Sequence, residues 1–138
     1  MQVWTRHSSM SGLAVVRQNL QPVVVAGRLA PQGLTGRGGW SVPSKGSYVA
    51  NRSALAELAN GSLVYVFGYH VTPSTVARVL LSVGARTAMM LDMNGSWPMA
   101  FTYTHAPALA GLRLNPHQYH DPSVYLTRYR KDFVVALA

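Results

Sequence analysis

The sequence has no cysteine among its 138 residues, which excludes disulfide bonds, thiolate catalysis and cysteine-based zinc sites together. The redox compartment is left undetermined by this absence. Long hydrophobic runs are also missing: runs such as Val23–Ala26 and Phe133–Ala138 fall far below the roughly 20 residues that a membrane-spanning helix needs. We therefore expect no membrane span. The N-terminal residues carry a positive charge but no apolar stretch before a small-residue cleavage site, so we expect no export signal.

Acidic residues are scarce as well. Twelve Lys and Arg residues face four Asp and Glu residues, which gives a net charge of +8 and a pI near 10.5. This surplus suggests an anionic partner. The basic residues are scattered apart from one cluster, Arg128, Arg130 and Lys131, whereas a nucleic-acid footprint usually forms a stripe with interleaved aromatic residues. Nucleic-acid binding is therefore disfavoured.

The scarcity of carboxylates narrows the search for a catalytic group. The candidates are Glu57, Asp92, Asp121 and Asp132. Asp92 directly follows the apolar run Thr87–Leu91, and the ends of such strands commonly hold ligand sites. Asn94, Gly95 and Ser96 add an amide, a permissive backbone and a hydroxyl, and burial beside apolar neighbours is expected to perturb the pKa of Asp92. An Asx turn capped by Asp92 explains the same pattern equally well.

Histidines are the only other candidate metal ligands of note. His117 and His120 lie three residues apart beside Asp121, but Pro116 and Pro122 oppose a helix that would present them together. We expect no metal site and no cofactor, and the sequence gives no support for a divalent metal. Serine-hydrolase chemistry is not expected either, because no Gly-x-Ser-x-Gly motif is present.

The composition predicts one folded domain over residues 1–138. A chain of 15.0 kDa buries roughly 68 to 70% of the surface that its unfolded form exposes. Hydrophobic residues make up 49% of the chain and charged residues 12%, so most apolar surface must be hidden in its own core or against a partner.

Short β-branched runs predict strands at both ends of the chain. Leu13–Val16 and Val23–Ala26 are two of them, the second ended by Gly27, and Phe133–Leu137 is expected to close the fold as a strand. Between them, Pro31–Lys45 holds too many glycines and prolines for a regular element and is expected to be a long loop.

The clearest local unit is a hairpin. Arg52–Ala59 and Ser62–Gly68 flank Asn60-Gly61, a dipeptide that suits a type I′ turn because both central residues there need positive φ. The second arm is typical of a strand. The first arm is rich in Ala and Leu, so by propensity alone it could also form a helical turn.

A helix is predicted after this hairpin. Thr72 and Pro73 suit its first positions, and Gly84 suits its end. Its expected core face consists of Val76, Val79, Leu80 and Val83. The run Thr87–Leu91 then predicts a strand covered on both faces. Strand, helix and strand in this order predict a crossover unit on a mixed β-sheet, and therefore a mixed α/β fold of the α+β kind.

Several linked stretches carry a family resemblance. They are Arg52–Ala56, Asn60–Val66, the helix ending at Gly84-Ala85, and Met89–Trp97. In this order they resemble the C-terminal half of the phosphodiester glycosidase family, whose members include an enzyme that removes N-acetylglucosamine from a phosphodiester. Upstream, Val15–Leu20 and Val23–Arg28 resemble a bacterial branch of it, so the resemblance runs from about residue 12 to residue 138.

Two departures from the family pattern are visible. The common pattern after Leu-Asp is a run of glycines followed by serine, whereas this chain has Met93-Asn94-Gly95-Ser96. The first half of the family domain, with its Asn-Gly-Gly-Phe-Phe-like loop, is missing. The resemblance therefore implies a truncated domain or one piece of a split protein.

The resemblance implies cleavage between the anomeric carbon of a sugar and a phosphodiester oxygen, in glycans or envelope polymers. Asp92 and Arg52 would be the catalytic residues, with Asp92 activating water and Arg52 clamping the phosphate. Asn94, Gly95 and Ser96 would orient the substrate, and Trp97 would stack on a sugar face unless it belongs to the core. A secreted or cell-envelope location would follow from the resemblance alone.

Two other hypotheses compete with this enzyme. The chain could be a non-catalytic relic or partner subunit, completed by its missing N-terminal half or by further copies of itself; an exposed apolar edge would favour this reading. It could also be a basic nucleic-acid-binding module, which predicts a steep salt dependence of binding.

Overall fold

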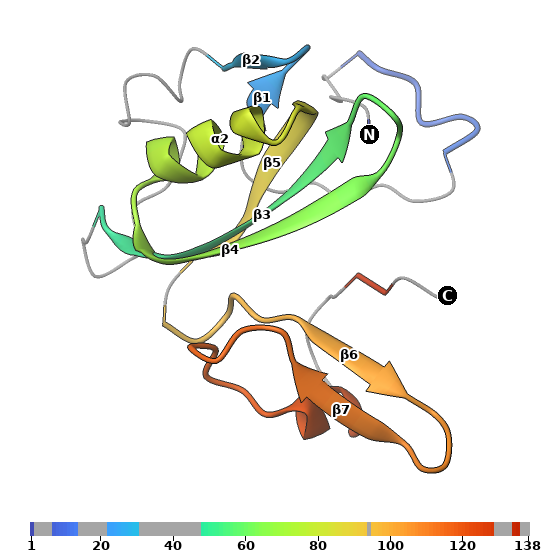
Figure 1. The fold of residues 1–138 in the computed structure, drawn as a ribbon. Coiled ribbons are helices and arrows are strands. Elements are labelled where there is room, and N and C mark those ends of the chain that lie inside the picture. Colours follow the sequence, from blue (N-terminus) through green and yellow to red (C-terminus); the bar gives the residue numbers. More distant parts are fainter. Residues whose placement is uncertain (2–6, 14–21, 31–47, 94, 129–133, 136–138) are drawn as a thin grey trace.

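The computed structural model describes residues 1, 7–13, 22–30, 48–93, 95–128 and 134–135 of the chain. One five-stranded sheet has the strand order β2-β1-β5-β3-β4, and a second sheet consists of β6 and β7. In the view of Figure 1, helix α2 lies against the large sheet, below β1 and β2 and above β4, and the β6–β7 hairpin lies below the large sheet. The expected α+β fold is confirmed.

Strands β3 (Ala50–Leu58) and β4 (Leu63–Val71) form the predicted hairpin. The helical alternative for the first arm does not occur, because β3 pairs with β4 on one side and β5 on the other. The expected type I′ turn is wrong: Gly61 has a φ of 83°, whereas Asn60 is absent from the positive-φ residues of the described chain. The Gly61 amide donates to the Leu58 carbonyl at 3.0 Å, which closes a three-residue loop that needs positive φ only at its glycine.

Helix α2 (Pro73–Ser82) begins as predicted, with the Thr72 hydroxyl accepting a hydrogen bond from the Thr75 amide at 3.2 Å. The predicted core face is only half correct. Val79 and Val83 are 44% and 48% exposed, and the buried positions are Pro73, Val76, Ala77 and Leu80. The helical spacing was right, but its buried stripe starts at the proline.

The length of α2 also bears on the membrane expectation. It has 10 residues. Within the part of the chain that the structure describes, no helix has the length and apolar character required to cross a membrane.

Strand β5 (Ala85–Met93) lies between β3 and β1 (Pro22–Val25). Both β4 and β5 run antiparallel to β3, so they run parallel to each other, and α2 makes the predicted crossover between them. Ala88 and Met90 are fully buried, whereas Met89 and Leu91 between and after them are half-buried. The expectation of a strand covered fully on both faces was therefore wrong for the face opposite α2.

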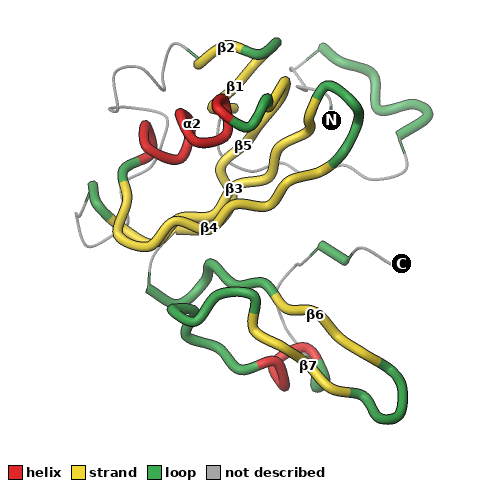
Figure 2. Tube along the Cα trace, viewed as in Figure 1, coloured by secondary structure: helices red, strands yellow, loops and turns green. Residues whose placement is uncertain are grey.

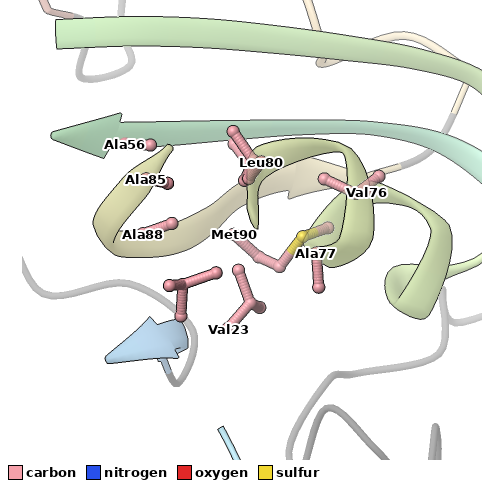
Figure 3. Close-up of a cluster of buried hydrophobic side chains, with 10 residues drawn as sticks. Val23, Ala56, Val76, Ala77, Leu80, Ala85, Ala88 and Met90 are labelled. Atoms are coloured by element: carbon pink, nitrogen blue, oxygen red, sulfur yellow. The ribbon is translucent and has the colours of Figure 1, made fainter. Parts of the chain in front are cut away.

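The main core lies between α2 and the large sheet, as Figure 3 shows. Its buried members are Val23, Val24, Ala54, Ala56, Val76, Ala77, Leu80, Ala85, Ala88 and Met90. The sheet contributes mainly alanines to this layer, and their small side chains let the helix approach closely. Most of the apolar volume is consequently supplied by a few larger residues such as Leu80 and Met90.

Strand β1 confirms the strand predicted at Val23–Ala26 to within one residue. It turns through Ala26 and Gly27, with φ of 50° and 72°, into the short strand β2 (Arg28–Leu29). Two successive positive φ values in a two-residue loop are the signature of a type I′ turn. The Gly27 amide donates to the Arg86 carbonyl at 2.9 Å, which ties this turn to β5. The predicted loop Pro31–Lys45, and the strand predicted at Leu13–Val16 apart from its first residue, lie outside the described residues.

The second sheet was not predicted. Strands β6 (Phe101–Thr104) and β7 (Ala110–Arg113) pair antiparallel, and the short 3-10 helix η1 (Pro122–Tyr125) lies beside β7 (Figure 2). The Tyr103 hydroxyl donates to the Pro122 carbonyl at 2.6 Å and fixes the hairpin to η1.

The strand predicted at Phe133–Leu137 lies mostly outside the described residues. Val134 and Val135 are described, belong to no strand, and are 61% and 59% exposed. For these two residues the prediction was wrong, because no neighbouring strand pairs with them in the part of the chain that the structure describes.

Candidate functional site

Asp92 lies within the last residues of β5, rather than directly after the strand as expected. The pairing of β5 with β3 is irregular at this point. The partners Ala54↔Met90 and Arg52↔Met93 leave Ser53 opposite two residues, Leu91 and Asp92, which is a β-bulge. The Ser53 hydroxyl donates to the Asp92 carbonyl at 3.2 Å. The bulge thus has a specific hydrogen bond from the neighbouring strand.

The Asp92 side chain is exposed. The burial that we expected for Asp92 is therefore wrong. An exposed carboxylate at the end of a buried strand is accessible to water and to a ligand, and bulges next to active sites commonly redirect a side chain in this way.

Tyr65 on β4 is the titratable neighbour of Asp92. Its hydroxyl donates to the Met99 carbonyl at 3.2 Å. Although 37% of the residue is exposed, desolvation by burial raises the pKa of Tyr65 to about 12; a hydrogen bond with Ser53 opposes this shift, and the negative charge of Asp92 adds to it. The phenol therefore stays neutral and keeps its proton throughout the physiological pH range.

Arg52 is fully buried, with 0% of its surface exposed. Its Nε donates to the Val71 carbonyl at 3.2 Å, its Nη2 donates to the Tyr48 carbonyl at 2.9 Å, and its Nη1 lies 3.5 Å from the Met93 sulfur. Burial lowers the pKa of the Arg52 guanidinium, while the charge of Tyr48 acts in the opposite direction. These two hydrogen bonds connect the Arg52 side chain on β3 to the end of β4 at Val71 and to Tyr48, which precedes β3.

The two predicted catalytic residues lie on neighbouring strands but on opposite faces of the sheet. Arg52 shares the face of Ala54 and Ala56, which pack under α2, because alternate strand residues share a face. Tyr65, which senses the charge of Asp92, pairs with Leu55 on the other face. The phosphate-clamp role of Arg52 stays a prediction, and it would require the guanidinium to exchange its carbonyl contacts for the ligand.

The predicted substrate-binding residues follow β5. Asn94 lies outside the described residues. Gly95 is exposed, and a Cβ built on it would meet nothing within 4 Å. Ser96 and Trp97 are half-buried, and the Trp97 ring lies tilted against His120 with their centres 6.2 Å apart. Trp97 is thus neither a core residue nor a freely exposed platform.

An open groove of about 470 Å³ lies on the side of β4 that carries Tyr65. It is lined by Tyr65, Phe67, Tyr69, Ala100, Leu114, Asn115 and His117. The volume falls within the range of small-ligand sites, and the lining carries no Lys, Arg, Asp or Glu. Tyr65 belongs both to this groove and to the surroundings of Asp92, so it links the two.

The groove was missed by sequence reasoning, although one signal was present. Tyr65 and Phe67 alternate along the predicted strand Ser62–Gly68, Tyr69 continues the pattern one residue beyond it, and alternate strand residues share a face. That pattern alone indicates an aromatic row. The opposite wall comes from Ala100 and the Leu114–His117 segment, and no sequence pattern brings this wall to β4.

A stack of three rings lies at one end of the groove. The rings of His70 and His117 each lie 4.3 Å from the Tyr69 ring and within 20° of parallel to it, so they occupy its two opposite faces. His70 reaches this position through a left-handed backbone, with a φ of 52°, and its amide donates to the side chain of buried Asn51 at 3.2 Å. Such conformations are found preferentially at functional sites.

The wall opposite β4 contains polar groups as well. The side-chain nitrogens of Asn115 and Gln118 are buried and have no hydrogen-bond partner among the described residues. The Gln118 oxygen accepts a hydrogen bond from the Ala100 amide at 3.0 Å. Buried donors usually find a partner, so these two nitrogens are exceptions within the described residues.

The two candidate metal ligands, His117 and His120, contact different aromatic rings. His117 stacks on Tyr69, whereas His120 packs against Trp97 and Tyr119. Across the described ranges, no group of three or more His, Asp or Glu side chains is arranged to hold a metal ion.

No family model, no curated protein and no solved structure matches the chain.

Proposed function

We propose that the chain is a glycosidase-type hydrolase domain that acts on sugar phosphodiesters of glycans or envelope polymers. Asp92 is the reacting carboxylate, and the aromatic groove holds the glycan. One observation carries this proposal: an exposed carboxylate on a bulge of β5 lies close enough to influence Tyr65, a residue that also lines the groove.

The chemistry of the linkage explains how one carboxylate could suffice. Ordinary glycosidases use two carboxylates, one of which protonates a poor alkoxide leaving group. A phosphodiester oxygen leaves without that help, because its negative charge is spread over the phosphate. In the proposed step a water oxygen bonds to the anomeric carbon and gives its proton to Asp92. The bond from that carbon to the phosphate oxygen breaks, and the phosphate keeps the electron pair.

The other described carboxylates are less suitable. Glu57 forms an ion pair with the N-terminal amino group. Asp121 accepts a hydrogen bond from the Ser123 amide at 3.0 Å, which caps η1, and lies 3.6 Å from Arg113. Asp132 lies outside the described residues. Asp92 is the described acid whose charge acts on Tyr65, a residue that lines the groove.

Two residues near Asp92 would assist it. Neutral Tyr65 offers a hydroxyl that can orient water or a sugar oxygen. Arg52, held by backbone carbonyls, contacts Met93 beside Asp92 and so acts as a positioning residue for the bulge. A phosphate clamp at Arg52 belongs to the proposal only if substrate displaces these contacts.

The groove suits a glycan for two reasons. Tyrosine rings present an apolar face together with a polar tip, and pyranose rings combine the same two properties. The net charge of +8 attracts an anionic polymer to the protein, while the uncharged groove itself accepts the neutral sugar.

A chromogenic sugar phosphodiester tests the proposal. Wild-type protein should hydrolyse it, and Asp92→Asn should lose about 10²-fold or more of the rate, because general-base catalysis typically supplies that much. Asp121→Asn is the matched control: it also removes one exposed carboxylate, but one whose charge acts on Tyr103 and not on Tyr65. The activity of Arg52→Ala is measured in the same assay, and circular dichroism confirms that this variant folds. Full activity in Asp92→Asn, or equal losses in both aspartate variants, would overturn the assignment.

A further inference from the structure

Strand β4 is an edge strand. It pairs with β3 on one side, and within the described ranges no strand pairs with its other side. With nine residues it is as long as β3 and β5, the longest strands described. A long edge presents a row of unpaired backbone groups that can template a further strand.

The register identifies which residues present those groups. The Leu58 amide donates to the Ser62 carbonyl at 2.9 Å, which makes this a hydrogen-bonded pair. Hydrogen-bonded and non-bonded pairs alternate in an antiparallel ladder. Val64 and Val66 therefore bond to β3, whereas the amides and carbonyls of Leu63, Tyr65 and Phe67 point outward.

Proteins usually protect such an edge with charged residues or proline. From Leu63 to Val71, β4 contains no Lys, Arg, Asp, Glu or Pro. Leu63 is 61% exposed and Tyr65 is 37% exposed. From Leu63 to Phe67 the outward backbone row is thus accompanied by apolar side chains and lacks charge and proline, while the irregular pairing between Gly68 and Val71 limits the regular edge to this stretch.

We infer that the free edge of β4 pairs antiparallel with β4 of a second copy of this chain, joining the two large sheets into one. This inference goes beyond the proposed hydrolase and does not depend on it. Pairing a strand with its own copy is the self-complementary arrangement of a two-fold dimer. It would also bring the grooves of the two copies to the same face of the joined sheet, because Tyr65 and Phe67 line the groove and lie on this edge.

The uncharged edge favours an uncharged partner strand over an acidic peptide. The net charge of +8 on each copy opposes the dimer, most strongly at low salt, but the uncharged strand adds no repulsion at the contact itself. An acidic peptide drawn to the basic protein would find no Lys or Arg on β4 to pair with. The outward ladder and the exposed leucine are, in contrast, matched by an identical strand.

Sedimentation measurements over a range of concentrations test this inference. The wild-type chain should reach twice its 15.0 kDa mass. Leu63→Lys should weaken the dimer by roughly tenfold or more, since an edge lysine is the usual device against pairing. Leu112→Lys is the matched control: it adds the same charge at a leucine that is 66% exposed, but on β7. Circular dichroism confirms that both variants fold.

A second variant and a residue-level readout remove ambiguity. Leu63→Pro deletes one outward amide without touching the bonds to β3 and should also weaken the dimer. In hydrogen exchange, the amides of Leu63, Tyr65 and Phe67 should gain protection as concentration rises, whereas those of Val64 and Val66 should be protected throughout. A monomer at every concentration, open-ended aggregates, or equal weakening by Leu112→Lys would overturn the inference.

Discussion

The two sheets of this protein are held in different ways. The large sheet has a continuous apolar layer under α2, in which Ala54, Leu80 and Met90 are completely buried. The small sheet has no comparable layer, and every residue of β7 is exposed. Its order comes from a few contacts: the Tyr103 hydroxyl on the Pro122 carbonyl, and the edge of the Phe101 ring on Tyr125 with centres 5.6 Å apart.

This difference indicates two levels of stability within one chain. Regions with few buried apolar contacts open more readily than a packed core, and an isolated two-stranded hairpin is marginal in water. The groove has one wall in each region: Tyr65, Phe67 and Tyr69 belong to the large sheet, and the opposite wall belongs to the segments that flank the small sheet. We therefore expect the groove to be rigid on one side and adaptable on the other.

The largest effect is expected in the large sheet. Leu80→Ala should lower the free energy of unfolding by about 2–5 kcal/mol, because it leaves a cavity in a layer that is otherwise rich in alanine. Val79→Ala, one residue away on the same helix and 44% exposed, should cost less than about 1 kcal/mol. Urea denaturation measures both. Equal losses would mean that α2 does not pack on the sheet as described.

An intermediate effect is expected in the small sheet. A Cβ at Gly111 would lie 2.3 Å from the Pro122 Cβ and 2.8 Å from the Tyr103 Cε1, so Gly111→Ala should cost about 1–3 kcal/mol through overpacking. Hydrogen exchange should show the faster opening in β6 and β7 and not in β3 or β5. Gly95→Ala meets nothing within 4 Å and serves as the control. Faster exchange throughout the chain would contradict the two-level description.

The smallest effects concern the two aspartate–tyrosine neighbourhoods. In NMR titrations Asp92→Asn should lower the raised pKa of Tyr65, whereas Asp121→Asn should lower that of Tyr103, where burial is the larger cause and Asp121 the smaller. Each substitution should leave the other tyrosine unchanged. A shift of both tyrosines by either variant would show that the two regions are electrostatically coupled.

The raised pKa of Tyr65 also determines how the stability of the fold changes at alkaline pH. Because folding raises the pKa of Tyr65 from 10.0 to about 12, its contribution to stability is fully present below pH 10 and is lost as the pH rises through 12. Tyr65→Phe should therefore flatten the fall in stability over this interval.

Local sequence signals predicted the elements well and their details less well. The start of α2 followed from Thr72 and Pro73, because capping depends only on neighbouring residues. The turn type did not follow from Asn60-Gly61, and a type I′ turn occurs instead at Ala26-Gly27, where the pairing of β1 with β2 fixes a two-residue loop. Loop length is set by strand pairing, which the dipeptide alone does not reveal.

The site was predictable only in part. Asp92 is a candidate because carboxylates are rare and one follows an apolar run, and its catalytic role stays a prediction. The burial of Arg52 was not foreseen, since it depends on carbonyls of Tyr48 and Val71 that pairing brings together. The second wall of the groove was missed for the same reason: Asn115 and His117 reach β4 only through the three-dimensional path of the chain.

The bulge opposite Ser53 has an evolutionary consequence. Two residues of β5 occupy the space of one there, so Met93 returns to the side of Met90 and meets Arg52. Loss of one of these two residues would restore regular pairing and leave Met93 opposite Arg52, whereas gain of one more residue would turn Met93 to the other side, since side chains alternate with a period of two. Related genes should therefore tolerate the loss of a residue in this stretch more readily than the gain of one.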